Sequence, residues 1–325
     1  MQDQRTSLRD VALAAGVSVG TASSALAGTG RVSDATRERV KRVAQTLDYA
    51  PHAGARNLRR SRAGSIGLVL PRIDAEDSFY LDFAMGAAEW AATQGVAVSI
   101  ITGAMLDDIP RLPVDAFLVP DVDVDSPRLA ELVADRRPVV TADTVPDGAP
   151  TPSAVVAIDH GAGIRSLLDH LVERGATRPA LLAPMTTVMW GRRLCAASAS
   201  WFEERSIPDL SETLLPGSSD ETVLLAARRL AAAGADAIVG VPMGSAEPLV
   251  RAFAEQREGR PLIAGYVDHA ALRAAGVTAV DLRPREVGAA CARLAVSATD
   301  SPGAVAAPSV LSIAPVLVPR SSTQR

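Results

Sequence analysis

The sequence predicts a small all-helical head followed by a large α/β body of two lobes. Three observations carry this prediction. The first fifty residues contain three short helix-period segments with cap residues. From Ser65 onward, strand-length apolar runs alternate with helix-period segments. A length of 325 residues, 48% of them apolar, suits two or three domains with a sizeable core.

Three helices are predicted in the head. Ser7 followed by Asp10 predicts a capping box, and Gly16 fits the position just past the end of the first helix. Ser18 is the predicted N-cap of the second helix. Ser33 is the predicted cap of the third, which ends before Pro51. Two short helices separated by a three-residue turn form a helix-turn-helix.

Residues 16–20 also spell Gly-x-Ser-x-Gly, the pattern of a hydrolase nucleophile elbow. Such an elbow needs a buried strand before the serine. The residues before Gly16 have helical spacing instead, so Ser18 is interpreted as a cap rather than a nucleophile. The sequence shows no catalytic triad spacing, and Gly161-x-Gly163 lacks the third glycine of a dinucleotide fingerprint. We expect no enzyme activity, no cofactor and no metal.

Charge separates the head from the body. Residues 1–62 hold 11 Lys and Arg against 5 Asp and Glu, a net charge of +6, whereas the remainder holds 22 against 32, a net charge of −10. This asymmetry is typical of a nucleic-acid-binding module joined to another function. A solvated helical face with surplus arginine would give the same count, so charge alone leaves both interpretations open.

The lack of an apolar targeting segment and the small number of cysteines favour a cytoplasmic protein. The N-terminus is polar, and no apolar run of 18 residues follows it, so we expect no membrane association. Two cysteines, Cys195 and Cys291, make neither a disulfide framework nor a metal spacing.

The alternation of strands and helices in the body predicts parallel sheets with helices on both faces. Its length exceeds what one such sheet needs, so two lobes are expected. Strands are predicted at residues 66–70, 96–101, 116–119, 139–142, 155–158, 180–183, 237–241, 262–266 and 278–280. Helices are predicted at residues 81–94, 161–174, 222–233, 247–257 and 285–297.

The ordered motifs of the chain resemble the lac repressor/galactose repressor family of bacterial transcription regulators. The head matches through Asp10-Val11-Ala12, Ala15-Gly16-Val17-Ser18, Thr21-Ala22-Ser23, Val32-Ser33, Thr36-Arg37, Leu47, Tyr49, Pro51 and Ala55-Arg56-x-Leu58. The body matches more weakly, and strands near residues 310–318 fit the family's last crossing between lobes. The resemblance implies a helix-turn-helix DNA-binding domain at 1–50, a hinge helix at 51–62, and a two-lobed periplasmic-binding-protein-like effector and dimerisation domain at 63–325.

The resemblance implies that residues 19–26 are a recognition helix in the major groove. Implied DNA contacts in the head are Ser18, Val19, Gly20, Thr21, Ser23, Ser24, Arg31 and Thr36. The family usually has a polar residue at the position of Gly20 and an arginine at that of Ser24. Base readout needs hydrogen-bonding or apolar side chains. With Gly20 and Ser24 at these positions, the recognition helix offers few side chains that can contact bases, which we call a bare reading surface. We expect lower affinity or a non-standard operator.

The hinge contacts implied by the resemblance are His52, Ala55, Arg56, Leu58 and Arg59. In the family, a hinge leucine from each subunit enters the minor groove and kinks the DNA, and Leu58 has that position. The alternative is a linker whose leucine packs on the body. Gly54 lowers helix propensity by about 1 kcal/mol relative to alanine, so a hinge that folds only on DNA is predicted.

Effectors of this family bind between the lobes, beyond the carboxyl ends of strands. The candidate contacts are Phe79, Asp159, Trp190, Arg193, Pro242 and Asp268. Pro242 and Met243 replace the family's usual Asn-Asp pair, and Val267 replaces the first acid of an acid pair. We therefore expect a small-molecule effector that is not a typical sugar. Alternative roles stay open: an interlobe ion pair for Arg193, a helix cap for Asp159, a core position for Trp190.

Taken together, the residues and the resemblance predict a transcription regulator, most often a repressor, that binds a pseudo-palindromic double-stranded DNA operator as a homodimer. Two other functions fit parts of the sequence. A solute-binding protein of a transport system suits the body but not the head. A cytoplasmic small-molecule-binding protein with degenerate DNA specificity would fit the bare reading surface.

Overall fold

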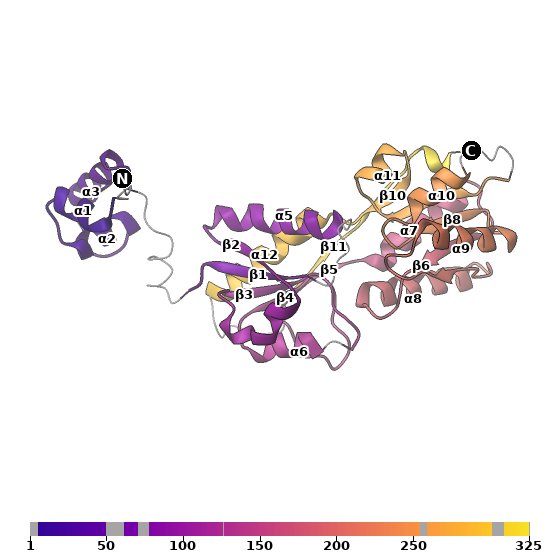
Figure 1. Cartoon of the computed structure of the whole chain (residues 1–325), viewed down its shortest axis with the longest axis horizontal. Helices are drawn as coiled ribbons and strands as arrows, with labels where there is room; N and C mark the ends of the chain where they lie inside the picture. The colour runs from indigo at the N-terminus through magenta and orange to yellow at the C-terminus, as the bar shows by residue number, and fades with distance from the viewer. Residues whose placement is uncertain are drawn as a thin grey trace. The chain divides into compact units, whose positions relative to one another are not determined.

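The computed structural model describes residues 6–49, 62–70, 78–125, 127–253, 259–300 and 309–324. The chain divides into two compact units, Met1–Gly64 and Ser65–Arg325, labelled by element in Figure 1. The first is the helical head and the second is the α/β body.

The head contains α1 (Leu8–Ala14), α2 (Val19–Ala27) and α3 (Asp34–Thr46). The predicted caps are confirmed: Ser7 and Asp10 form a capping box, and Ser33 caps α3. Gly16 has a φ of 64° just past α1, a conformation that costs glycine little. The core residues are small, so the three helices approach closely: Val11, Ala12, Ala15, Ala22, Ala25, Val40 and Ala44.

The first lobe of the body is built on a parallel six-stranded sheet of order β11-β5-β4-β3-β1-β2. Its strands are β1 (Ser65–Val69), β2 (Ala97–Ile101), β3 (Ala116–Val119), β4 (Val139–Thr141), β5 (Ala154–Ile158) and β11 (Ser309–Ile313). Helices α5 (Ser78–Thr93) and α12 (Pro284–Asp300) share one core with one face of the sheet. The 3-10 helix η1 (Gly103–Arg111) and α6 (Pro127–Ala134) share another core with the opposite face.

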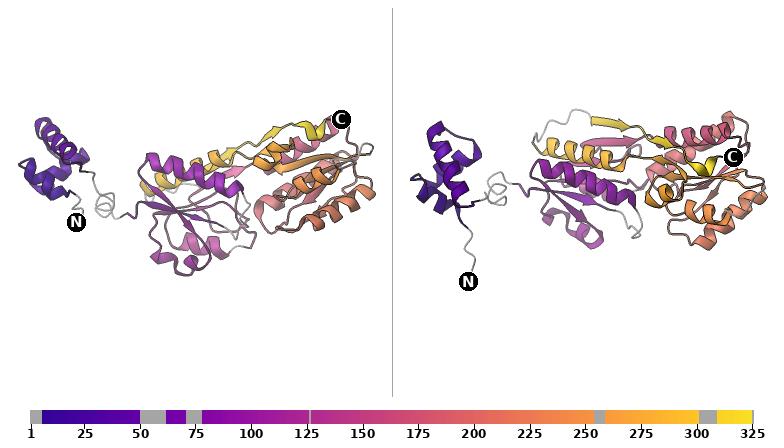
Figure 2. Two further views of the ribbon diagram at one scale, coloured as in Figure 1. Left: turned by 45° about the horizontal axis from the view of Figure 1, so that its top comes forward. Right: turned by 90° about the horizontal axis from the view of Figure 1, so that it is seen from above.

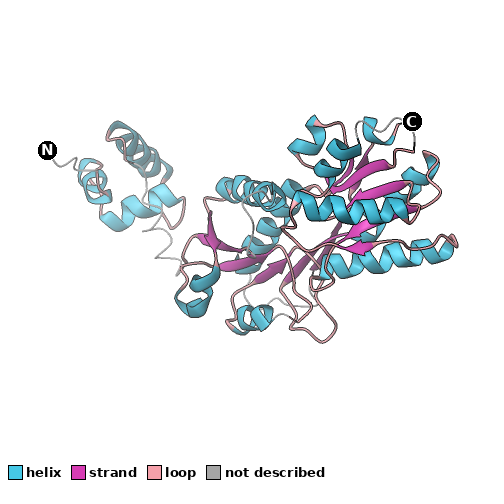
Figure 3. Cartoon of the chain, turned by 45° about the vertical axis from the view of Figure 1, so that its right-hand side comes forward, coloured by secondary structure: helices cyan, strands magenta, loops and turns pink. Residues whose placement is uncertain are grey.

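The second lobe has the sheet order β12-β10-β9-β8-β6-β7, parallel except for β12. Its strands are β6 (Pro179–Ala183), β7 (Glu212–Thr213), β8 (Ala237–Gly240), β9 (Leu262–Val267), β10 (Thr278–Asp281) and β12 (Val316–Val318). Helices α7 (His160–Glu173) and α8 (Met189–Glu204) cover one face, and α9 (Asp220–Ala232) and α10 (Ala246–Phe253) cover the other. The short α11 (Ala270–Ala274) and η2 (Ser321–Thr323) complete it. Figure 3 shows both sheets between helical layers.

Three described segments cross between the lobes. The chain crosses from β5 to α7, from β10 to α12, and from β11 to β12. As a result α12 packs on α5 in the first lobe, although the strand that precedes it, β10, lies in the second. Figure 2 shows the last strands, in yellow, running from one lobe into the other.

Helices α5 and α12 touch through their backbones. A methyl group at Gly86 would overlap the carbonyl oxygen of Arg285, and one at Gly288 would overlap that of Phe83. Each glycine therefore makes room for the other helix. This close approach fixes how α12 sits on the first lobe.

The predicted fold class is confirmed, and all nine predicted strands lie within one residue of the observed bounds at each end. Helices α6 and α8 were missed. Residues 184–193 were expected to be a strand-end loop, whereas α8 begins at Met189. No side chain caps α8, since its N-cap residue is Val188, so the usual sequence signal for a helix start is missing.

Candidate DNA-reading helix and effector site

The exposed start of α2 is the candidate DNA-reading surface of the head. The Ser18 hydroxyl accepts a hydrogen bond from the Thr21 amide at 3.0 Å, as predicted for a cap, and lies 2.8 Å from the Thr21 hydroxyl. Val19, whose exposed fraction is 47%, and Gly20 follow at the solvent-facing end of the helix. A helix N-terminus offers free amides to an anion such as phosphate.

The other predicted head contacts lie around this helix end. Ser23 and Ser24 are half-buried, and the Ser24 side chain packs beside Gly30. Arg31 is exposed between α2 and α3. The Thr36 hydroxyl lies 2.9 Å from that of Ser33 in the first turn of α3. No arginine or lysine stands within α2 itself, so the helix presents small side chains alone.

The predicted hinge contacts lie outside the described residues. These are His52, Ala55, Arg56, Leu58 and Arg59. Their roles stay predictions.

In the body, Asp159 is a helix cap. Its Oδ1 accepts a hydrogen bond from the Ala162 amide at 2.9 Å, and Asp159 stands at the crossing from β5 to α7. A helix cap is one of the two roles that the sequence leaves open for Asp159. The carboxylate is exposed, so it keeps free acceptor capacity beside this crossing.

Trp190 and Arg193 lie in the first two turns of α8. The half-buried Trp190 ring stands 5.8 Å from the buried His160 ring, centroid to centroid. His160 Nδ1 lies 3.0 Å from the Tyr266 hydroxyl of β9. Burial lowers the pKa of His160 to about 4; the charge of Asp159 opposes this shift and that of Arg193 adds to it, so this imidazole is neutral at pH 7.

Asp143, just after β4, is a residue that the sequence prediction did not select. Its Oδ1 accepts a hydrogen bond from the Thr144 amide at 2.7 Å. Its Oδ2 is buried and has no hydrogen-bond partner among the described residues. Burial raises the pKa of Asp143 to about 6, while the Thr144 bonds and the charge of Arg193 oppose that rise. A buried orphan acceptor near an exposed arginine is a place where a ligand donor would be favourable.

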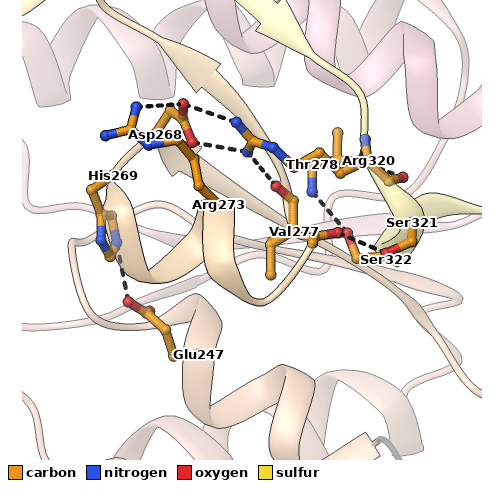
Figure 4. Close-up of polar contacts among 10 residues, drawn as sticks. Glu247, Asp268, His269, Arg273, Val277, Thr278, Arg320, Ser321 and Ser322 are labelled. Carbon is orange, nitrogen blue, oxygen red and sulfur yellow. Dashed lines mark hydrogen bonds and ion pairs between the residues drawn. The ribbon is translucent and has the colours of Figure 1, made fainter.

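Asp268 is held by two arginines, as Figure 4 shows. Arg320 contacts its two carboxylate oxygens at 2.8 and 3.0 Å, and Arg273 lies 3.2 Å away. Arg320 also donates to the Val277 carbonyl at 2.6 Å. Only 4% of the Asp268 side chain is exposed. This placement favours a structural role for Asp268, tying the C-terminal segment to the end of β9.

Pro242 and Phe79 flank a contact between the lobes. The half-buried Pro242 accepts a hydrogen bond from the Ser245 amide through its carbonyl at 3.1 Å. The next residue, Met243, lies with its sulfur 3.8 Å from the Ser78 hydroxyl at the start of α5. Phe79 packs edge-on against Tyr80 at 5.5 Å. The segment after β8 and the start of α5 therefore meet where the Met243 thioether contacts the Ser78 hydroxyl.

Among the described residues, no cluster of three or more His, Cys, Asp or Glu is arranged to hold a metal ion. In the same part of the chain, no single helix is long and apolar enough to cross a membrane. Helices α1 and α2 pass that test of length and composition only as a pair bent by 101°.

Comparison with known proteins identifies what the two parts of the chain resemble. The model of the lacI family of bacterial regulatory proteins matches residues 7–52, and that of a periplasmic-binding-protein-like domain matches residues 168–323. The chain therefore carries a head that matches the lacI family and a body that matches a periplasmic-binding-protein-like domain. Members of this family are transcriptional regulators, not enzymes, so the interpretation of Ser18 as a cap agrees with the family.

Individual relatives of this chain match over parts of their length. The maltose regulon regulatory protein MalI of Escherichia coli K12 is 39% identical over 31% of this chain and 29% of its own. The regulator RafR of E. coli is 27% identical over 64% of this chain and 63% of its own. The chain thus covers less than two thirds of these curated relatives.

Solved structures match over nearly the whole chain. The lac repressor dimer bound to operator and the anti-inducer ONPF has a TM-score of 0.77 at 20% identity, covering 99% of this chain and 100% of that one. The transcriptional regulator CelR in complex with cellobiose has a TM-score of 0.68 at 25% identity, covering 98% and 100%. The lacI-like arrangement of a helical head and a two-lobed body is therefore shared.

Proposed function

We propose that this protein is a transcriptional repressor that binds a pseudo-palindromic operator as a homodimer, with its affinity set by a small-molecule effector. The observation that carries the proposal is the exposed, Ser18-capped start of α2 in a lacI-family head joined to a two-lobed body. We place its action in the cytoplasm, where the operator DNA is.

The DNA contact proposed for α2 depends on shape more than on hydrogen-bonding side chains. Val19 can touch a thymine methyl, and Gly20 lets the helix backbone approach the groove. The hydroxyls of Ser18, Thr21, Ser23 and Ser24, together with Arg31 and Thr36, contact phosphates in this proposal. Affinity should be low and strongly salt-dependent, because phosphate contacts dominate it.

We place the second part of the DNA contact in residues 51–62. Leu58 would enter the minor groove, while Arg56 and Arg59 bind phosphate beside His52 and Ala55. Gly54 favours a hinge that becomes helical only on DNA. Hydrogen exchange of residues 51–60 with and without operator tests this, and protection in the free protein would contradict it.

The dimer is proposed to form through the first lobe. Leu81 and Met85 lie one turn apart on α5 with exposed fractions of 65% and 42%, and Ile100 on the edge strand β2 is 55% exposed. Helix α5 and β2 are in contact, so these apolar side chains belong to neighbouring elements of one lobe. Exposed apolar residues grouped in this way mark an interaction surface.

The effector is proposed to lie between the lobes, near Phe79, Asp159, Trp190, Arg193 and Pro242. Asp143 joins this set because its buried Oδ2 needs a donor. Asp268 is proposed to support the site indirectly, because its ion pairs with Arg273 and Arg320 hold the end of β9 in place. Since Pro242, Met243 and Val267 bring few polar groups, the effector should be less polar than a sugar, with a hydrogen-bond donor for Asp143 and an acceptor for Arg193.

The experiment that tests the proposed function is selection of bound DNA from a random pool by the full-length protein, repeated across a salt series. Enrichment of a pseudo-palindrome with a steep salt dependence supports a specific operator-binding repressor.

A second candidate function is favoured by the small side chains at Gly20 and Ser24. It is a small-molecule-binding protein whose DNA specificity has degenerated. Salt-sensitive binding with no enriched sequence in the same selection would support it and contradict the first proposal.

A further inference from the structure

Two loops from different lobes pair as a short antiparallel ladder. Asp123, after β3, and Val188, before α8, form an isolated antiparallel bridge. The Val124 amide donates to the Thr187 carbonyl at 2.8 Å, and the Met189 amide donates to the Val122 carbonyl at 2.9 Å. We call residues 122–124 together with residues 187–189 the clasp.

A methionine from the second lobe fills a core in the first. Met189 begins α8 and is 8% exposed, yet it belongs to the hydrophobic cluster formed by η1, α6 and one face of the first sheet. Val122, in the other half of the clasp, is buried in the same cluster. Because Met189 comes from the second lobe, its burial in the first-lobe core favours the paired state of the loops.

The clasp also completes the start of α8. The first amides of a helix have no partner within the helix. No side chain caps α8 among the described residues, and the Met189 amide is satisfied by Val122 of the other lobe. A methyl group at Gly191 would overlap the Met185 carbonyl oxygen, so the preceding loop and the first turn of α8 are packed tightly together.

Two of the proposed effector contacts share this helix start. Trp190 follows Met189 directly, and Arg193 lies one turn further along. A ligand that moves either side chain by turning α8 must therefore strain the two backbone bonds of the clasp. On the first-lobe side, the Tyr80 hydroxyl of α5 donates to Asp121, which adjoins Val122. Both halves of the clasp are thus fixed to helices.

We propose that the clasp is the element that converts effector binding between the lobes into a change of operator affinity. This inference rests on the proposed function, because it assigns a regulatory route to the same site. A two-state element that both ligands bias is the physical requirement for such coupling. Making the clasp permanent and loosening it should therefore shift operator affinity in opposite directions.

The first arm of the test locks the clasp. Asp123 and Val188 form the type of antiparallel pair whose α-carbons are about 4.5 Å apart, which a disulfide can span. We would make D123C/V188C in a C195S background, with D123C and V188C alone as controls, and measure binding to the selected operator in oxidised and reduced glutathione. Oxidation should change the operator Kd at least about five-fold in the double variant only.

Thermodynamic reciprocity supplies an internal check. The operator should shift the disulfide equilibrium by the same factor by which oxidation shifts the operator Kd, and a scrambled duplex of equal length should not. A disulfide that forms without moving the operator Kd beyond about two-fold would overturn the proposal. So would a double variant that folds but forms no disulfide.

The second arm loosens the clasp without new cysteines. M189A should shift the operator Kd in the direction opposite to oxidation, while M105A, which trims an exposed methionine of η1, should leave it unchanged. Shifts in the same direction would contradict the coupling. If the reduced and unsubstituted proteins select no sequence, the proposed function fails instead, which distinguishes the two failures.

Discussion

His170 Nε2 and the Thr323 hydroxyl are joined by a buried hydrogen bond of 2.8 Å across 153 residues of sequence. The Thr323 hydroxyl also lies 2.7 Å from that of Thr278. The C-terminal residues are thereby built into the interior of the second lobe. Burial lowers the pKa of His170, with the charge of Arg174 adding to the effect, which favours the neutral ring in this network.

We therefore predict that Thr323→Val destabilises the body by about 1–3 kcal/mol, because it leaves buried polar partners unsatisfied. Thr213→Val, at an exposed threonine of β7, is the matched control and should have little effect. Urea unfolding of both variants measures the difference. Equal stabilities would show that the network contributes nothing.

The pH dependence of stability should contain two opposing contributions. Burial raises the pKa of Asp143 from 3.8 to about 6 and lowers that of His160 from 6.5 to about 4. Between pH 3.8 and about 6, the folded chain keeps a proton on Asp143 that the unfolded chain releases. Asp143 therefore lowers the stability of the fold as pH rises. The unfolded chain protonates His160 and the folded chain does not, so that group raises stability as pH rises.

Single substitutions should reveal each contribution. Relative to the unsubstituted protein, the stability of Asp143→Asn should rise with pH between about 4 and 6, by up to about 1.4 kcal/mol per pH unit. The stability of His160→Gln should fall over the same interval. Urea unfolding at several pH values measures both trends. Curves parallel to that of the unsubstituted protein would contradict the assignment.

Gly86→Ala should destabilise the first lobe strongly or prevent folding, since the new methyl group would overlap the Arg285 carbonyl at the α5–α12 contact. Gly161→Ala in α7 is the matched control, because its methyl would make only ordinary contacts of 3.4 Å. That control should be neutral or stabilising by up to about 1 kcal/mol. Thermal unfolding distinguishes the two, and similar melting temperatures would argue against the tight crossing.

Ser18 allows folding and DNA binding to be separated. Ser18→Ala should destabilise the head by about 1 kcal/mol through loss of the cap. Ser18→Asp keeps a capping oxygen and suits the helix dipole, yet it adds negative charge beside DNA. The aspartate variant should thus fold as well as the unsubstituted head and bind operator more weakly. Circular dichroism melts and operator titrations check both, and equal binding by Ser18→Asp would remove α2 from the interface.

Leu81→Glu should convert the proposed dimer to monomer and weaken operator binding, because it places a charge in the apolar surface of α5. Leu225→Glu, at a comparably exposed leucine of α9 in the second lobe, is the control. Sedimentation analysis of both variants reports the oligomeric state. A dimer that survives Leu81→Glu would place the interface elsewhere.

The sequence predicted the architecture well where local signals suffice. Parallel strands that are buried on both faces appear in the sequence as continuous apolar runs bounded by turn residues. Examples are β1, which contains the buried Leu68, and β8, which contains the buried Val239. The caps Ser7, Ser18 and Ser33 were identified because a cap and its partner lie three residues apart. These signals need no knowledge of the rest of the chain.

The site was harder to predict, because its decisive features come from distant residues. Helix α8 is completed by the Val122 carbonyl, which its own sequence does not reveal. Asp143, Asp159 and Asp268 all follow strands, yet one is an orphan acceptor, one is a cap and one is ion-paired. Only tertiary packing separates these three roles.

The route of the chain between the lobes has a consequence for synthesis. The first lobe receives its edge strand from Ser309–Ile313, and the second receives β12 from Val316–Val318. Both lobes therefore need strands that are synthesised after α12, whereas the helical head is synthesised before either lobe and can fold alone. A chain that stopped before β11 would have a complete helical head but two lobes that each lack an edge strand.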